Sequence, residues 1–263
     1  MKPYTTKDIE ISLRKIGIKK DDSVFINPEI FKLGKYKDAK NKREYYKNFY
    51  LVIKKIIGLD GTICVNTYTF DTLRYKKKFI YENNKCTSGE FSNLILGEKN
   101  CTRSNHPVFS VTAIGRLSKF ICQNNSFHNY GYNSPYHKFL KINGKILNLG
   151  MDPWRNPFNH VAEFLVGVPY CYNKLTVVKY FKNNKKKNFI FSSFVRYLNL
   201  ELKPNYRILE KELLKKKIIK KFNLGDGFLY SVNAKKYTDL CINILSKNQF
   251  AFINKSLYKR SIS

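Results

Sequence analysis

The chain has 263 residues, of which 43% are hydrophobic and 15% aromatic, a composition typical of a globular protein and not of a disordered one. It carries 49 Lys and Arg residues against 19 Asp and Glu, a formal net charge of +30. No apolar run reaches the roughly 18 residues of a membrane span, and the first residues lack the apolar core of a signal peptide. We therefore expect a cytoplasmic protein without a membrane span.

The strongly basic charge has two interpretations. A basic surface is typical of nucleic-acid binding, but a biased codon usage that enriches Lys, Asn, Ile, Phe and Tyr together gives the same total. The basic residues are spread along the whole chain, which disfavours a nucleic-acid partner. The charge still favours anionic over cationic ligands. The six cysteines form no C-x-x-C pair, so we expect free thiols, no zinc site and no disulfide framework.

Apolar periodicity predicts helices alternating with strands through most of the chain. In chain order, it predicts a helix over 5–16, a strand in "DDSVFIN", a helix over 44–57, a strand over 62–66, a loop over 71–88, and helices over 89–97 and 111–123. After these it predicts a turn and strand over 143–152, a helix over 158–167 and strands over 175–181 and 188–195. The last predicted elements are a helix over 207–222, a strand over 228–232 and a helix over 234–246. This pattern indicates one α/β domain over residues 1–263, with a central mixed β-sheet flanked by helices.

One short segment, "PFNHVAEF", carries a candidate acid–base pair. His160 and Glu163 lie three positions apart, so they share one face of the predicted helix. The preceding "NGKILNLGMD" reads as a buried strand, and ligand sites in α/β proteins favour the carboxyl end of such a strand. Spacing alone leaves the alternative of a surface or structural histidine open. No second histidine at metal-ligand spacing follows, so we expect no metal site.

Two further segments carry polar residues with a chemical use. "TRSNHPVFSV" presents Arg103, Ser104 and His106 near a helix predicted from about residue 111, an arrangement that suits an anion. "YGYNSPYHKFL" places Ser134 and Pro135 as the cap and first residue of a helix. Each segment alone is equally consistent with an ordinary capped turn.

Taken together and in order, these segments resemble the aminoglycoside 3-N-acetyltransferase family. Its members show R-S-x-H-P-x-x-S-x-x-A-x-G, then G-x-x-S-P, then a strand ending L-L-G, then T-x-x-H-x-x-E. "GIKKDDSVFIN" and "GTICVNTYTF" resemble two upstream motifs, and the resemblance covers roughly residues 5 to 250. The matching residues are Arg103, Ser104, His106, Pro107, Ser110, Ala113, Gly115, Gly131, Ser134, Pro135, Leu149, Gly150, His160 and Glu163.

The chain departs from the family at three places. Members follow the first strand with H-S-S-L, whose small residues face the pantetheine arm of acetyl-CoA, whereas this chain reads "INPEIFKLG". Because proline has no amide hydrogen, Pro28 cannot repeat a backbone contact to that arm. "VNTYTF" carries Asn66 in place of the family proline, and Pro157 replaces the threonine that precedes the histidine.

The resemblance implies acyl-CoA-dependent N-acyl transfer, with acetyl-CoA or another acyl-CoA as donor and no metal. His160 would take the proton of the attacking amine, and Glu163 would orient its ring. Backbone amides near Ile26, Asn27 and Pro28, with the hydroxyl of Thr69, would face the developing oxyanion. By the same resemblance, Arg103, Ser104 and His106 would contact coenzyme A.

The acceptor amine is not given by the resemblance alone. The family's aminoglycosides are polycations, which a chain this basic would repel. We therefore expect a small amino-sugar acceptor, specifically a nucleotide-linked one used in surface polysaccharide synthesis. The alternatives are a true aminoglycoside 3-N-acetyltransferase, and an inactive fold that binds an anionic glycan or nucleic acid. The oligomeric state is left open, with a homodimer as one option.

Overall fold

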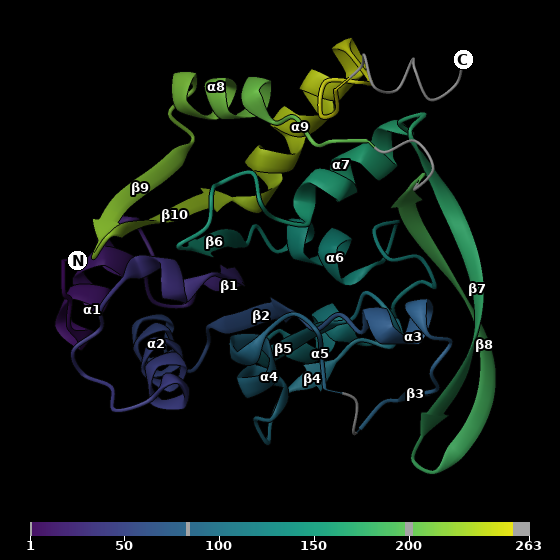
Figure 1. Cartoon of the computed structure of the whole chain (residues 1–263), viewed down its shortest axis with the longest axis horizontal. Helices are drawn as coiled ribbons and strands as arrows, with labels where there is room; N and C mark the ends of the chain where they lie inside the picture. The colour runs from purple at the N-terminus through teal and green to yellow at the C-terminus, as the bar shows by residue number, and fades with distance from the viewer. Residues whose placement is uncertain (1, 83–84, 198–201, 255–263) are drawn as a thin grey trace.

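A computed structural model of the chain describes residues 2–82, 85–197 and 202–254 (Figure 1). Its centre is a seven-stranded sheet in the order β4-β5-β2-β1-β6-β10-β9. The three central strands β2, β1 and β6 are parallel, and every outer neighbour is antiparallel. The strands are β1 (Ser23–Pro28), β2 (Thr62–Asn66), β4 (Thr102–Arg103), β5 (Val111–Gly115), β6 (Lys145–Leu149), β9 (Ile219–Leu224) and β10 (Gly227–Asn233). The predicted mixed sheet is therefore confirmed.

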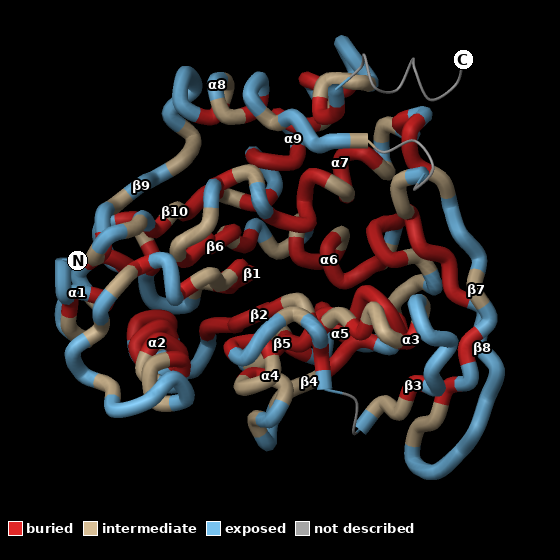
Figure 2. Tube along the Cα trace, viewed as in Figure 1, coloured by how far each residue is buried: buried red, intermediate tan, exposed pale blue. Residues whose placement is uncertain are grey.

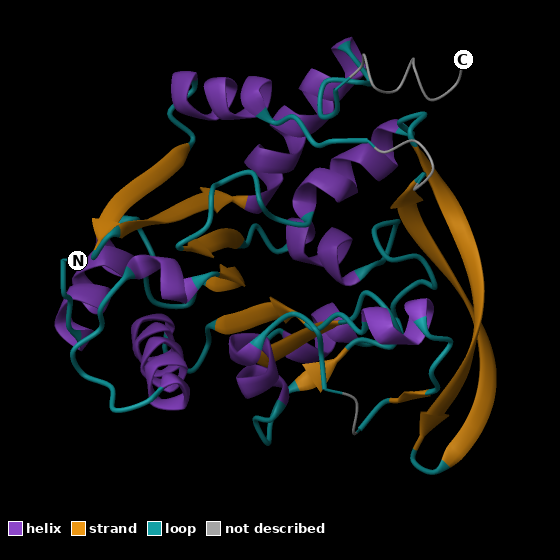
Figure 3. Ribbon diagram, in the orientation of Figure 1, coloured by secondary structure: helices purple, strands orange, loops and turns teal. Residues whose placement is uncertain are grey.

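Helices cover both faces of this sheet (Figures 1 and 3). One face packs against α1 (Thr6–Lys15), the 3-10 helix η1 (Ile30–Leu33), α2 (Lys42–Ile57) and α4 (Glu90–Leu96). The opposite face packs against α5 (Ser118–Cys122), α6 (Pro135–Lys141), α7 (Phe158–Val166), α8 (Arg207–Lys215) and α9 (Ala234–Lys247). A short helix, α3 (Phe70–Arg74), follows β2.

The central strands are buried on both faces because they lie between these two helical layers (Figure 2). In β1, Val24 and Ile26 belong to the core under α1 and α2, whereas Phe25 belongs to the core under α6 and α7. This alternation is the two-residue period of a strand. Both faces being apolar explains why β1, β2 and β6 read in the sequence as continuous apolar runs.

A long antiparallel hairpin runs along one side of the molecule (Figure 1). It consists of β7 (Cys171–Lys182) and β8 (Lys185–Arg196), and the two-residue strand β3 (Phe79–Ile80) pairs with β7. Its turn residues Asn183 and Asn184 both have positive φ, at 49° and 59°, as a type I′ turn requires. The register pairs Cys171 with Arg196, so β8 ends beside the segment that follows α7.

Most predicted elements are confirmed, including two helix ends set by glycine. The chain ends α4 at Gly97 and α7 at Gly167, the latter in the left-handed conformation. Thr5 caps α1 with a capping box, and Ser134 caps α6 with Pro135 at its first position. The two strands predicted over 175–181 and 188–195 are longer than predicted.

Three predictions are wrong in part. The helix predicted over 111–123 is a strand, β5, followed by the short helix α5, because the "VTAIG" segment pairs with β2. The helix predicted over 207–222 ends at Lys215. A turn with Lys217 at φ 50° follows, and the chain continues as the edge strand β9 paired with β10. The predicted loop over 71–88 contains most of α3 and all of β3.

Among the described residues, no helix is both long and apolar enough to cross a membrane. All six cysteines are free thiols, and all but Cys101 are buried.

Candidate active site

A cavity of about 930 Å³ opens at the carboxyl ends of the parallel strands. Ile26, Asn27 and Pro28 of β1 line it together with Asn66 at the end of β2. The loop after β6 and the first turn of α7 supply further lining residues, among them Trp154 and His160. This is the place where the connections of an α/β sheet leave room for a ligand.

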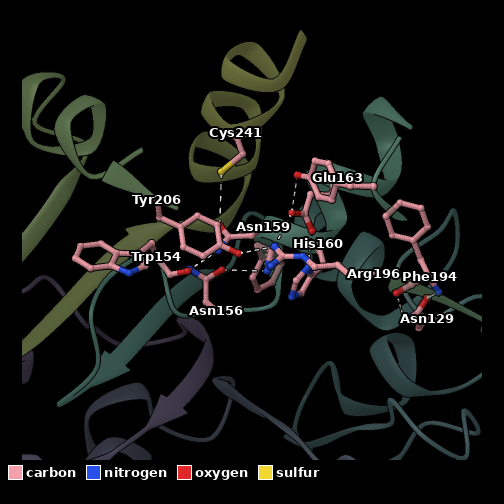
Figure 4. Close-up of polar contacts among 12 residues, drawn as sticks. Asn129, Trp154, Asn156, Asn159, His160, Glu163, Phe194, Arg196, Tyr206 and Cys241 are labelled. Carbon is pink, nitrogen blue, oxygen red and sulfur yellow. Dashed lines mark hydrogen bonds and ion pairs between the residues drawn. The ribbon is translucent and has the colours of Figure 1, made fainter. Parts of the chain in front are cut away.

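His160 and Glu163 form a hydrogen-bonded pair on α7 (Figure 4). The distance from His160 Nδ1 to Glu163 Oε2 is 2.5 Å. The Glu163 side chain is fully buried, whereas 37% of the His160 side chain is exposed and the residue lines the cavity. The start of α7 is fixed locally, since the Phe158 amide donates to Asn156 Oδ1 at 3.0 Å. The local spacing therefore does bring the two predicted side chains together.

The buried carboxylate of Glu163 is held by two further donors. The Tyr170 hydroxyl and Arg196 Nη2 each donate to Oε1 at 2.9 Å. Arg196 also donates to the Tyr206 hydroxyl at 3.1 Å. Although burial alone would raise the pKa of Glu163, His160, Arg196 and Tyr170 together lower it to about 2. Glu163 is therefore ionised at neutral pH.

This charge state fixes the tautomer of the neutral imidazole. An ionised carboxylate can only accept hydrogen bonds, so His160 Nδ1 must donate to Glu163. The lone pair of the neutral ring is then on Nε2. The ring of Tyr130 lies 5.5 Å from the imidazole, centroid to centroid, and also lines the cavity. A base with this orientation can accept a proton from an amine bound in the cavity.

The first-strand segment predicted to meet the acyl donor does line this cavity. Ile26, Asn27 and Pro28 all contribute to its wall. Thr69, by contrast, is buried and its hydroxyl donates to the carbonyl of Pro107. Thr69 is not among the described residues that line the cavity, although its neighbours Tyr68 and Phe70 are.

Arg103, Ser104 and His106 are also not among the described residues that line the cavity. Arg103 is buried, and it donates to Ser110 Oγ and to the Thr67 carbonyl, both at 2.9 Å. Ser104 Oγ accepts from the Val111 amide at 2.9 Å. The structure therefore gives Arg103 and Ser104 partners within the protein and does not place them with His160 among the described residues of the cavity wall.

His106 is likewise built into the fold. Its Nδ1 accepts from the amides of Val108 and Phe109, at 3.2 and 3.0 Å. Nε2 therefore carries the hydrogen and faces the Ser192 carbonyl at 3.3 Å, which ties this turn to β8. Burial lowers the pKa of His106 to about 4, so the ring is neutral at physiological pH. It also borders a second, separate cavity under the hairpin.

The sequence reasoning missed Tyr170, Arg196 and Tyr130. Tyr170 precedes β7 and lies seven residues after Glu163, and Arg196 ends β8, 33 residues after Glu163, so the one-turn spacing within α7 reaches neither. Tyr130 directly precedes the glycine of the "GYNSP" segment, and this position next to a family motif was the only feature of the sequence that pointed to it.

The fold agrees with the comparisons with known proteins. A family model described as aminoglycoside 3-N-acetyltransferase matches residues 46–246, which is more than half of the chain. The chain belongs to this family. It is accordingly an acyl-CoA-dependent N-acyltransferase, and the resemblance seen in its motifs is confirmed. No curated protein matches the chain significantly.

Several solved structures share the fold of this family member. AAC-IIIb in its binary complex with CoASH is 17% identical, with a TM-score of 0.79 over 93% of this chain and 97% of that one. AAC-VIa bound to sisomicin is 17% identical, with a TM-score of 0.77 over 93% and 98%. YokD from Bacillus subtilis is 17% identical, with a TM-score of 0.75 over 93% and 100%. At such low identities the likeness shows the fold alone.

Proposed function

We propose that this enzyme transfers an acyl group from acyl-CoA to the amine of an amino sugar, with His160 as general base and Glu163 as its partner. The observation that carries the proposal is the 2.5 Å contact between His160 Nδ1 and a fully buried, ionised Glu163. This contact leaves the imidazole Nε2 as a proton acceptor on the wall of a large cavity.

The reaction balances with these groups alone. The attacking amine gives its proton to His160 Nε2 as the new N–C bond to the acyl carbon forms. Collapse of the tetrahedral intermediate breaks the C–S bond, and the imidazolium returns the proton to the leaving thiolate. The products are an amide and the free thiol. Glu163, with Arg196 and Tyr170 behind it, stabilises the transient imidazolium and keeps its ring oriented.

Acetyl-CoA is the proposed donor, and another acyl-CoA is the alternative. The family assignment supports an acyl-CoA, and AAC-IIIb, which shares the fold, is a complex with CoASH. Ile26, Asn27 and Pro28 line the cavity where a pantetheine arm would approach His160. The proposed contact of Arg103, Ser104 and His106 with coenzyme A rests on the motif resemblance alone, since their polar atoms bond within the protein.

For the acceptor, we propose a nucleotide-linked amino sugar of the kind used in surface polysaccharides. The described charged residues that line the cavity, apart from His160, are Glu29, Glu90, Lys42 and Arg155, two of each sign. Glu29 is already paired with Lys32 and, at 3.2 Å, with Arg155. This cavity therefore offers little surplus negative charge to a polycation, and the overall charge of +30 attracts an anion.

An aminoglycoside is the second candidate acceptor. The family description names this class, and AAC-VIa, with the same fold, is bound to sisomicin. Glu90 lies on the cavity wall in the first turn of α4 and supplies a carboxylate that an ammonium group could contact. An aminoglycoside carries several ammonium groups, each of which needs a partner. A single carboxylate therefore favours its binding less than a cluster of carboxylates would.

A thiol-release screen tests both acceptors. Purified protein is supplied with acetyl-CoA and longer acyl-CoAs, and amino-sugar nucleotides are compared with aminoglycosides. We expect release only when an amine acceptor is present, and a higher kcat/KM for the amino-sugar nucleotides. Efficient turnover of aminoglycosides without turnover of sugar nucleotides would replace our acceptor by the second candidate. No release with any pair, and no thermal stabilisation by acyl-CoA, would overturn the enzymatic assignment.

A further inference from the structure

A row of three asparagines crosses the ends of the three parallel strands. Asn66, Asn27 and Asn148 belong to β2, β1 and β6, and the register places Asn27 directly beside Asn148. Each lies two residues after a strand residue of the core under α6 and α7, namely Cys64, Phe25 and Ile146. Side chains two apart in a strand share a face, so the row lies on the face of the sheet that carries α7 and His160.

The three side chains of the row are connected to one another by hydrogen bonds. Asn27 Nδ2 donates to Asn148 Oδ1 at 2.9 Å, and Asn66 Nδ2 donates to Asn27 Oδ1 at 3.4 Å. Asn148 Nδ2 donates to the backbone carbonyl of Asp152 at 2.6 Å. A carbonyl can only accept, so this last bond fixes the orientation of the Asn148 amide and, through it, the orientation of the other two.

The chain of hydrogen bonds continues in the same direction to the buried Tyr136 and the half-buried Tyr68. The Tyr136 hydroxyl donates to Asn66 Oδ1 at 2.8 Å, so its oxygen must accept from the Tyr68 hydroxyl, also 2.8 Å away. Burial raises the pKa of both phenols well above the usual range, so both keep their protons. Every amide oxygen of the row is thus occupied by a donor from within the protein.

The amide nitrogens of the row are not fully used. Each carries two hydrogens, and the bonds above account for one hydrogen on Asn27 and one on Asn66. Both residues line the cavity together with His160, whereas Asn148 is not among the described residues that do so. At the next position Pro28 has no amide hydrogen to offer. Asn27 and Asn66, both on the wall of the cavity, therefore each keep one N–H group that the bonds above do not use.

We propose that the side-chain amides of Asn27 and Asn66 donate hydrogen bonds to the acyl carbonyl oxygen of the donor, where negative charge develops during attack. This inference rests on the proposed acyl transfer and names two catalytic residues for it. The row holds both amides in one orientation before the substrate arrives. Donors that need no reorganisation are the ones that stabilise an oxyanion most.

Steady-state thiol release tests the proposal with Asn27→Ala and Asn66→Ala. Asn129→Ala is the matched control, because Asn129 is an asparagine as buried as Asn27 that bonds the backbone of β8 and is not among the described residues lining the cavity. We expect kcat to fall about 10²-fold in each test variant. The KM for acyl-CoA should change little, since the charge exists only in the transition state. The control should lower Tm without a comparable loss of kcat.

The outcomes separate this inference from the proposed function. Asn66 is only half-buried, so Asn66→Ala provides a folded test even where Asn27→Ala is unstable. If the wild type turns over, His160→Ala does not, and Asn66→Ala retains full kcat, the asparagine proposal is wrong and the enzymatic one stands. A loss of kcat that follows Tm equally in the test variants and in Asn129→Ala would also overturn it. A wild type that releases no thiol would overturn the proposed function first.

Discussion

Replacing Glu163 by glutamine isolates the charge at the centre of the site. Glutamine has the size of glutamate and is a permanently uncharged substitute for it. In the wild type, the pKa of the Glu163 carboxyl falls from 4.5 to about 2 because His160, Arg196 and Tyr170 outweigh the cost of burial. Each unit of pKa corresponds to about 1.4 kcal/mol, so the charge contributes about 3 kcal/mol to the free energy of unfolding. Breaking a buried ion pair generally costs about 3–5 kcal/mol, which is consistent with this value.

The sign of the pH dependence follows from the lowered pKa. The stabilisation is fully present above about pH 4.5, where the unfolded chain also carries the charge. It is lost as the pH falls through about 2, where the folded protein takes up the proton. We therefore expect Glu163→Gln to be less stable than the wild type by about 3 kcal/mol near neutral pH. The difference should shrink as the pH falls below the pKa of the unfolded carboxyl.

Urea denaturation of wild type and variant near neutral pH and near pH 3 measures this difference directly. Other carboxylates titrate in both proteins and cancel in the comparison. A difference that is the same at both pH values, or that is absent near neutral pH, would refute the assignment of an ionised, paired Glu163. Thiol release by the same variant should fall about 10²–10⁴-fold, because an amide no longer enforces the required imidazole tautomer.

Three further substitutions probe neighbouring contacts. Tyr170→Phe removes the hydroxyl that donates to Glu163 Oε1 and should cost about 1.5–3 kcal/mol in urea denaturation; unchanged stability would argue against that bond. His160→Ala should lower kcat about 10²–10⁴-fold in thiol release and should also lower Tm, because the buried Glu163 Oε2 loses the donor that helps to lower its pKa; unchanged turnover would remove His160 from the mechanism. Gly150→Ala should lower stability by about 1–3 kcal/mol, since φ is +70° and the new Cβ would lie 2.5 Å from the Glu29 carbonyl oxygen; an unchanged Tm would contradict this.

The sequence predicts best where a local signal determines the structure. Gly167 ends α7 in the left-handed conformation that glycine adopts readily, and Gly97 follows the last apolar turn of α4. His160 and Glu163 are placed together by helix geometry alone, which spans only one turn. The central strands are recognisable because burial on both faces makes them continuous apolar runs.

Prediction fails where a distant partner decides the conformation. The "VTAIG" segment that forms β5 fits a helical pattern, but it pairs with β2, whose first residue Thr62 aligns with Gly115. The basic "IIKKFNL" segment fits the end of an amphipathic helix, yet the hydrogen bonds of β10 make it the edge strand β9. Arg196 was missed for the same reason, since it reaches Glu163 from the end of β8, 33 residues along the chain.

The two polar systems of the site lie on the same face of the sheet, and the roles proposed for their residues determine how the reactants are oriented. The pair His160–Glu163 projects from α7, and the row Asn66–Asn27–Asn148 projects from the strands beneath it. On the proposed roles of His160, Asn27 and Asn66, the acyl carbon lies between base and donors, the amine approaches from the side of His160, and the carbonyl oxygen faces the two asparagines. The opposite face of β1 packs Val24 and Ile26 against apolar side chains. On these proposed roles, acyl donor and acceptor share this cavity, and the residues of its wall, including Glu90 and Arg155, select the acceptor.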